Sequence, residues 1–444
     1  MDAMRQTGIR WIGEIPSDWK TKRIKYMATL KGRIGWQGLT SEEYQDEGAY
    51  LVTGVDFLNG GINWEQCEHV PMKRWEEARD IQIENGDLLI TKDGTIGKVA
   101  IVSNMPGETS LNSGVLRIVP MEGYSRRFLY WVLLSEEFWN WFNFKNAGNS
   151  TIAHLYQGDF AEFIYAFPGY AEQEAIADFL DRECAKLDDI IETIEMQIEV
   201  LQHYKKSIIT EAVTKGLNRS ARMKNSGINW IGEIPDHWDV KRMKYVLSSP
   251  LQYGANEMGD DYSDDIPRYI RITDIAEDNT LKDEGKQSLP WKVAKPYLLM
   301  DGDVLFARSG ATVGKTYYYR QEDGVAAFAG YLIKARTNRE VVLPRFLYYT
   351  TLGVGYENWK NMVFTQATIQ NIGADKYSQL ILTVPPVIEQ KVIIQHLDSV
   401  CERIDNIFTQ KRNQLAVMKA HKESLIYEYI TGKKSVKEVQ QNAH

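Results

Sequence analysis

The stretch GIRWIGEIPSDWKTKRIKY, Gly8–Tyr26, decides the fold, because it is written a second time as GINWIGEIPDHWDVKRMKY at Gly227–Tyr245. The two copies are identical at 13 of 19 positions. Two further blocks return in the same order: GDLLITKDG from Gly86 as GDVLFARSG from Gly302, and the segment from Phe167 as the segment from Val384. The chain is therefore one unit of roughly 217 residues written twice, and a repeat of this kind fixes the domain organisation.

Each repeat contains a globular part and a helical part. Short β-branched runs between Gly and Asn turn signals predict strands with a few helices in the globular parts. After Pro168-Gly169 and Pro385-Pro386 the chain is rich in Glu, Lys, Leu and Ile and has neither Gly nor Pro over some 45 residues, which predicts long helices. The expected α+β chain divides into a globular domain at 1–167, a helix at 168–217, a globular domain at 218–384, a helix at 385–434 and a tail at 435–444.

The long helices carry a sustained heptad pattern. In the first, a positions fall on Leu180, Leu187, Ile194, Leu201 and Ile208, and d positions on Cys184, Ile191, Ile198, Lys205 and Ala212. The same frame continues in the second helix, from Leu397 to Tyr429. The net charges are −6 for residues 172–216 and +2 for residues 385–434, and unlike charges favour pairing of one helix with the other. We predict an antiparallel coiled coil between the helices; the alternative is two amphipathic helices packed on separate cores.

Composition excludes several classes of protein. With 25% charged and 43% hydrophobic residues the chain is ordinary for a globular protein, and it has no run of 18 apolar residues. The stretch MDAMRQTGIRW lacks the apolar core of a signal peptide, so export by that route is not expected. We therefore expect no membrane association. Three cysteines without Cys-x-x-Cys spacing predict neither a disulfide framework nor a zinc site and fit a reducing cytoplasm. The seven histidines form no metal-ligand pair on one helix face, so no metal site is expected.

One stretch, RSGATVGKT at Arg308–Thr316, is similar to a phosphate-binding loop, written G-x-x-x-x-G-K-[ST]. Its first glycine is replaced by Ser309, and the counterpart KDGTIGKVA at Lys92–Ala100 places Asp93 in the turn and lacks the magnesium-binding hydroxyl. A carboxylate repels phosphate, so nucleotide hydrolysis is disfavoured. Both copies keep a Gly-bracketed turn with two cations, which suits contact with a nucleic-acid phosphate.

Catalytic motifs are missing from the sequence. The chain has no Asn-Pro-Pro-aromatic or Asp-Pro-Pro-aromatic tetrad of an amino-methylating site, since VPPV at Val384 lacks both the polar residue and the ring. It also has no G-x-G-x-x-G turn for a cofactor. We predict no catalytic residue.

Three duplicated blocks carry a family resemblance: W-I-G-E-I-P-x-x-W, G-D-[LV]-L-[IF]-x-[KR]-x-G and E-Q-x-x-I-x-x-x-L-D. Together they resemble the specificity subunit of type I restriction-modification systems, over the whole chain to about Lys434. The resemblance implies two target-recognition domains that each read one half of a bipartite, asymmetric site in double-stranded DNA. It further implies that the helices set the spacer and dock methyltransferase subunits, two by expectation, and that ATP-dependent restriction subunits join. S-adenosylmethionine, ATP and Mg are then expected on the partners and no cofactor on this chain.

Candidate DNA-binding residues lie in loops that differ between the repeats while the flanking blocks agree, and their side chains are of types that read base edges or hold phosphates. In the first domain they are Arg33, Trp36, Gln37, Lys92, Thr95, Lys98, Asn112, Ser113, Asn149 and Ser150. In the second they are Gln252, Tyr253, Asn256, Arg271, Arg308, Ser309, Lys315, Thr316, Gln366 and Thr368.

The overall charge of −8 is unusual for a DNA-binding protein, and partner subunits are expected to supply much of the positive charge. Two alternatives stay open on the sequence. One is a nucleotide-binding enzyme that uses Lys315 and Thr316. The other is a coiled-coil scaffold without DNA specificity.

Overall fold

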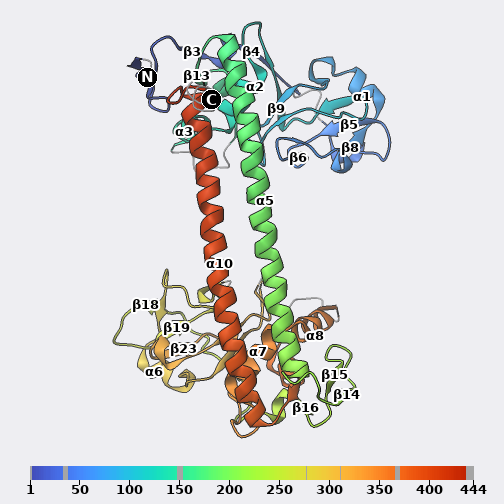
Figure 1. Cartoon of the computed structure of the whole chain (residues 1–444), viewed down its shortest axis with the longest axis vertical. Helices are drawn as coiled ribbons and strands as arrows, with labels where there is room; N and C mark the ends of the chain where they lie inside the picture. The colour runs from blue at the N-terminus through green and yellow to red at the C-terminus, as the bar shows by residue number, and fades with distance from the viewer. Residues whose placement is uncertain are drawn as a thin grey trace. The chain divides into compact units, whose positions relative to one another are not determined.

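A computed structural model describes residues 3–33, 39–147, 154–276, 278–310, 312–365 and 371–436 of the chain (Figure 1). The fold is α+β, as predicted. The chain forms two compact units, Met1–Ile194 with Asn413–His444, and Glu195–Arg412. Each unit is built from strands and short helices together with parts of two long helices, α5 at Tyr170–Lys215 and α10 at Val387–Ile430.

Over its described residues, the first unit contains two main sheets and four short helices. One sheet is antiparallel in the order β10-β9-β12-β4; the other has the order β11-β5-β8, with β11 parallel to β5. The strands are β1 Met4–Gln6, β2 Glu14–Pro16, β3 Lys20–Arg23, β4 Ala28–Gly32, β5 Ala49–Val52, β6 Phe57–Leu58, β7 Gly61–Ile62, β8 Glu68–Val70, β9 Leu88–Thr91, β10 Val99–Ile101, β11 Thr109–Leu111, β12 Val115–Pro120 and β13 Ile164–Phe167. The helices are α1 Met72–Glu76, α2 Arg126–Leu134, α3 Glu136–Asn146 and α4 Gln157–Phe160.

The second unit repeats this plan. Its sheets have the orders β22-β21-β24-β17 and β23-β19-β20-β18, and β23 is parallel to β19. The strands are β14 Met223–Asn225, β15 Glu233–Pro235, β16 Asp239–Arg242, β17 Gln252–Tyr253, β18 Asp260–Asp261, β19 Arg268–Ile270, β20 Gln287–Ser288, β21 Val304–Ala307, β22 Thr316–Tyr318, β23 Ala326–Phe328, β24 Leu332–Ala335 and β25 Ile381–Val384. The helices are α6 Trp291–Ala294, α7 Pro344–Leu352, α8 Val354–Thr365 and α9 Ala374–Ser378.

The central strand of each unit is apolar on both faces because both faces are covered. In β9, Leu88 and Ile90 belong to the core that contains the α2 and α3 side chains, whereas Leu89 belongs to the core shared with β5 and β11. Alternate residues of a strand point to opposite faces, so one sheet separates two cores. In β21, Val304 and Leu305 are divided between two cores in the same way.

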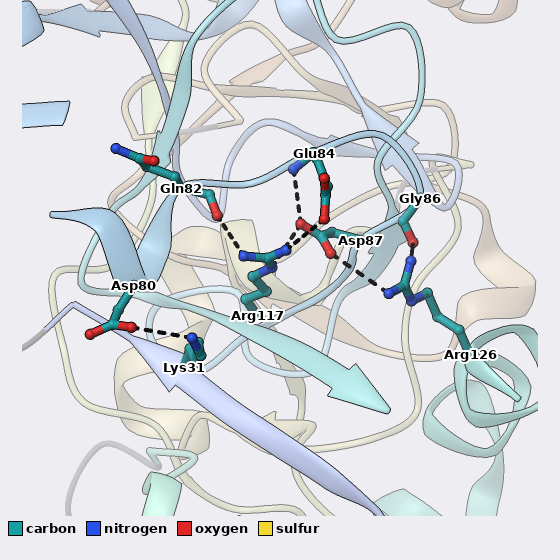
Figure 2. Close-up of polar contacts among 8 residues, drawn as sticks. All are labelled: Lys31, Asp80, Gln82, Glu84, Gly86, Asp87, Arg117 and Arg126. Carbon is teal, nitrogen blue, oxygen red and sulfur yellow. Dashed lines mark hydrogen bonds and ion pairs between the residues drawn. The ribbon is translucent and has the colours of Figure 1, made fainter. Parts of the chain in front are cut away.

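The duplicated Gly-Asp before each central strand has a structural role (Figure 2). Asp87 is fully buried, and its carboxylate accepts a hydrogen bond from the Glu84 amide at 2.9 Å and lies 2.7 Å from Arg117 Nε. Asp303 accepts from the Met300 amide at 2.8 Å and from Arg336 at 2.7 Å. Each aspartate thereby holds the turn that leads into the central strand, and the buried charge is paired.

The start of each long helix is fixed by a buried glutamine of the E-Q motif. The Gln173 side chain accepts from the Ser125 amide at 2.8 Å and donates to the Pro168 carbonyl at 2.9 Å. The Gln390 side chain accepts from the Leu343 amide at 2.8 Å and donates to the Pro385 carbonyl at 2.8 Å. A buried amide with both ends paired ties the helix start to the globular part that precedes it.

The end of each helix completes a core. Ile426, Tyr429 and Ile430 of α10 join the core that contains Ile15 and Trp19, the first copy of the duplicated W-I-G-E-I-P-x-x-W block. The counterparts in the second unit are Ile209, Ala212 and Val213 of α5, which join the core with Ile234 and Trp238. Both helices end on a glycine with positive φ, Gly216 and Gly432, packed so closely on this block that a Cβ on Gly432 would lie 2.5 Å from Pro16 Cδ.

Within each unit α5 and α10 lie side by side in opposite directions (Figure 1). In the first unit the rings of Phe179, near the start of α5, and Tyr429, near the end of α10, are 4.3 Å apart. The predicted a and d positions from Leu180 to Ala212 and from Leu397 to Tyr429 are all buried or half-buried.

The same interhelical ion pair is formed twice. Lys422 Nζ lies 2.5 Å from Asp188 Oδ1 in the first unit, and Lys205 Nζ lies 2.5 Å from Asp405 Oδ1 in the second. The two lysines occupy equivalent positions of the two repeats, and so do the two aspartates. Both lysines stand at d positions, where a polar residue helps to set the register of paired helices.

Asp188→Lys should lower the free energy of unfolding by about 1 kcal/mol, because it replaces a half-exposed ion pair by two like charges. Adding Lys422→Asp should restore most of the loss. Denaturant unfolding of the two single variants and the double variant measures the coupling. A double variant whose destabilisation equals the sum of the single effects would contradict this pairing, and Asp405→Lys with Lys205→Asp is the matched test in the second unit.

Candidate nucleic-acid interface

Predicted DNA-binding loops of the first domain meet at one end of its central sheet. The Lys92 amide donates to the Gly114 carbonyl at 2.8 Å, and the Thr95 hydroxyl donates to the Gly54 carbonyl at 2.9 Å. The turn between β9 and β10 is thereby joined to the loop of Asn112, whose Oδ1 accepts from the Gly114 amide at 3.0 Å.

Two cations are available at this end of the sheet. The ammonium groups of Lys92 and Lys98 make no hydrogen bond or ion pair with any residue that the structure describes. Lys98 is exposed, and so is Thr95 in the same turn. Ser113, in the neighbouring loop of Asn112, is exposed as well. The cluster therefore offers cations and small polar side chains together, which is the chemistry of phosphate and base contacts.

The second domain gathers its predicted residues at the equivalent place. The Arg308 amide donates to the Tyr331 carbonyl at 3.0 Å, and the Arg308 guanidinium lies 4.9 Å from the centre of the Tyr253 ring. The Tyr253 hydroxyl accepts from the Ala374 amide at 2.9 Å. Tyr253, Arg308 and Ser309 thus lie together.

Three further predicted residues of this domain lie around that group. Asn256 is exposed, with its amide beside Gly330. The Lys315 ammonium lies 3.4 Å from the Ile275 carbonyl, and the Gln252 amide donates to the Pro296 carbonyl at 2.9 Å. Gln252 and Lys315 are therefore engaged with the domain itself, whereas Asn256 faces solvent.

Two predicted base readers make contacts within their own domain. Arg33 is buried and donates to the Leu111 carbonyl at 2.8 Å and to the Ser110 hydroxyl at 2.9 Å, and burial lowers the pKa of its guanidinium to about 10. Arg271 forms an ion pair with the buried Asp274 at 2.7 Å, and this hydrogen bond raises the pKa of the arginine. Both arginines hold loops of their own domain. Arg33 is buried, whereas the Arg271 side chain is 29% exposed, and its contact with DNA stays a prediction.

The position of Thr316 argues against the predicted contact of its hydroxyl with DNA. It also argues against the nucleotide-binding alternative. Its side chain is 2% exposed, and its hydroxyl shares a hydrogen bond with that of Thr351 at 2.8 Å. The turn from Arg308 to Lys315 joins two antiparallel strands, β21 and β22, whereas a phosphate loop leads from a strand into a helix N-terminus. The hydroxyl that would bind magnesium is therefore inside the domain.

Six predicted residues lie outside the part of the chain that the structure describes: Trp36, Gln37, Asn149, Ser150, Gln366 and Thr368. One exposed pair was missed from the sequence, Asp93 with His154, whose side chains are hydrogen-bonded at 2.7 Å. An alignment of the two repeats around residues 93 and 154, with their counterparts 309 and 371, could have pointed to this pair.

The family model described as "Type I restriction modification DNA specificity domain" matches residues 16–200 and 258–417. The chain belongs to this family. The two matched regions correspond to the two repeats, and the specificity subunits of type I systems are their non-catalytic recognition subunits. The predicted family and the absence of catalysis by this chain are thereby confirmed.

Specificity subunits also appear among the similar proteins. The StySPI specificity subunit of Salmonella potsdam is 22% identical over 95% of this chain and 90% of the relative. The putative MjaX specificity subunit of Methanocaldococcus jannaschii is 25% identical, with 96% of each chain covered. A solved chain described in the words "Structural basis underlying complex assembly and conformational transition of the type I R-M system" has a TM-score of 0.66 at 14% identity and covers 95% of this chain. At that identity the likeness shows the fold.

No helix in the described ranges is long and apolar enough to cross a membrane. Over the same ranges no three side chains of His, Cys, Asp or Glu gather as a metal ion would need.

Proposed function

We propose that the two globular domains read the two halves of a bipartite, asymmetric DNA site. The observation that carries this proposal is the position of the divergent loops. In both domains the divergent loops lie at the same end of the equivalent four-stranded sheet. The buried Gly-Asp turn and the E-Q helix start make the same contacts in the two domains. A shared scaffold with different exposed side chains is what two readers of different sequences need.

The long helices act in this proposal as an antiparallel coiled coil that sets the spacing between the half-sites. Its support is the repeated Lys–Asp pair and the burial of the a and d positions in each unit. Unlike net charges on the two helices favour pairing with each other over self-pairing.

Two methyltransferase subunits dock, one on each repeat. Exposed residues that are identical in the two repeats support this. Tyr26 and Tyr245 are 56% and 64% exposed, and each ring is covered by the preceding lysine, Lys25 at 5.2 Å and Lys244 at 4.9 Å. Two copies of one surface suit two copies of one partner. ATP-dependent restriction subunits complete the assembly, and S-adenosylmethionine, ATP and Mg are bound by the partners.

The proposed compartment is the cytoplasm. Cys67, Cys184 and Cys401 are free and buried, and burial raises the pKa of each thiol. Unpaired thiols fit a reducing environment.

Co-expression with the neighbouring methyltransferase tests the function. The pure chain should transfer no methyl group, and the complex should methylate a bipartite sequence with an unspecified spacer, read by sequencing of methylated sites. Replacing residues 1–167 by those of a relative should change one half-sequence and leave the other half and the spacer unchanged. Methylation by the single chain, or a change in both half-sequences after the exchange, would refute the proposal.

Lys92→Ala and Lys98→Ala should each weaken DNA binding by the assembled complex on every sequence and reduce its salt dependence by about one phosphate contact. Lys98→Arg, which keeps the charge, is the matched control and should retain the slope. Affinities measured over a salt series decide the matter. An altered target preference with an unchanged slope would instead make the lysine a base reader.

A further inference from the structure

The two domains share one backbone contact at the end of the central strand. The Leu155 amide donates to the Lys92 carbonyl at 3.0 Å, and the Ile372 amide donates to the Arg308 carbonyl at 2.8 Å. Lys92 and Arg308 hold the same place in the duplicated blocks GDLLITK and GDVLFAR, and Leu155 and Ile372 stand at equivalent positions before β13 and β25. The backbone hydrogen bond is therefore the same in both repeats. It brings residue 93 beside residue 154 in the first domain and residue 309 beside residue 371 in the second.

These adjacent positions carry different side chains in the two domains. In the first they are Asp93 and His154, with the carboxylate Oδ1 2.7 Å from the imidazole Nδ1. In the second they are Ser309 and Asn371, which form an antiparallel β-bridge. The side chains of Asp93 and His154 are 43% and 40% exposed, and Asn371 is exposed. The backbone arrangement is therefore equivalent in the two domains, whereas the exposed side chains at this place differ.

The Asp93–His154 contact determines what the histidine offers to a ligand. A carboxylate only accepts hydrogen bonds, so Nδ1 of His154 carries the proton and donates to Asp93. When Nδ1 carries the ring's one proton, Nε2 is an acceptor. In the DNA major groove, an acceptor pairs with the exocyclic amino group of adenine or cytosine and rejects the carbonyl oxygen of guanine or thymine.

We infer that His154 reads a base in one half-site by accepting a hydrogen bond from an exocyclic amino group, and that Asp93 is its positioning residue. The inference rests on the proposed DNA recognition and adds the residue and the base chemistry. The cations beside the pair, Lys92 and Lys98, hold the phosphates of the same half-site. At the same place the second domain offers the exposed Asn371 amide, which both donates and accepts and so differs in its chemistry from an acceptor alone.

Two variants of the full chain, each assembled with the methyltransferase subunit, test this inference by sequencing of methylated sites. His154→Phe keeps an aromatic ring and removes the acceptor, so one position of one half-sequence should lose its preference for amino-bearing bases by about tenfold. Asp93→Asn lets the ring adopt either tautomer, because an amide both donates and accepts, and should relax the same position. His203→Phe, which removes a highly exposed histidine on α5, is the control and should leave the site unchanged.

The outcomes separate this inference from the proposed function. If the wild-type complex methylates a bipartite site and both variants keep every base preference, His154 does not read a base and recognition by the domain still stands. If the wild-type complex methylates no defined sequence, the proposed function itself fails. Uniform loss of methylation at all sites, with an unchanged melting temperature and complex size, would also overturn the inference, since it would make the pair a general binding element.

Discussion

Adding seven residues to each long helix should lengthen the unspecified spacer of the methylated site by about one to three base pairs and leave both half-sequences unchanged. Seven helical residues add about 10 Å, and one base step of B-DNA is about 3.4 Å. The insertions belong next to Ile194 in α5 and Lys411 in α10, which stand at equivalent a positions of the two repeats. A whole heptad keeps the a and d positions in phase on both sides of each insertion. Bending of the duplex and rotation of the domains reduce the realised change below the added helix length.

Insertions of four residues at the same two sites are the control. They add less length and break the heptad phase between the two Lys–Asp pairs, so the buried stripe can run through both pairs only if the helices unwind locally. We expect such a variant to lose stability and activity instead of shifting the spacer smoothly. The decisive measurement is the sequence of sites methylated by the seven-residue variant. An active variant with the original spacer would mean that the helices do not set the distance.

The α+β organisation and the long helices were predictable because their signals are local or repeated. About 45 residues without Gly or Pro and with an unbroken heptad frame predict a helix without any knowledge of tertiary contacts. The repeat also provided a second, independent example of each motif, which exposed the defective phosphate loop. Sequence comparison of the halves therefore carried most of the prediction.

Non-local partners decided what the sequence could not. Arg33 has the residue type of a base reader, but its acceptors, Leu111 and Ser110, lie 78 and 77 positions away, and pairing with them buries the guanidinium. The reverse holds for Asp93, which in the sequence is only a residue that a phosphate-binding loop would not tolerate. It gains its proposed role because His154, 61 positions further along the chain, lies 2.7 Å from its carboxylate. Residue type predicts what a group can do, and only the fold determines which partner uses it.

A buried carboxyl group in the first unit should make the stability of the fold depend strongly on pH. Glu137 of α3 is 1% exposed, and neither of its side-chain oxygens has a hydrogen-bond partner among the residues that the structure describes. Burial raises the pKa of this carboxyl to about 8, and the positive charge of Lys433 offsets only part of the effect. At neutral pH the folded state therefore keeps a proton that the unfolded chain, with its ordinary pKa of 4.5, has already released.

The sign of the pH dependence follows from this difference. A group that binds its proton more tightly when folded stabilises the fold fully below pH 4.5, and the contribution is lost as the pH rises towards 8. The loss is on the order of a few kcal/mol, because each pKa unit corresponds to about 1.4 kcal/mol. For a unit of this size, we expect the melting temperature of the wild-type chain to fall by roughly 5 to 15 °C between pH 5 and pH 8 through this group.

Glu137→Gln should remove that fall, since an amide of the same shape does not ionise. The variant carries the cost of its own unpaired amide at every pH, so its melting temperature should lie below that of the wild type at pH 5 and above it at pH 8. Thermal melting of both chains over this range gives the two curves. The second repeat provides a natural comparison, because Gly355 stands where the first has Glu137, so the helices α7 and α8 carry no such proton. Hydrogen exchange at pH 5 and pH 8, corrected for the intrinsic rate, should therefore show protection falling in α2 and α3 and not in α7 and α8. Parallel melting curves for the two chains would mean that Glu137 is already ionised in the folded state.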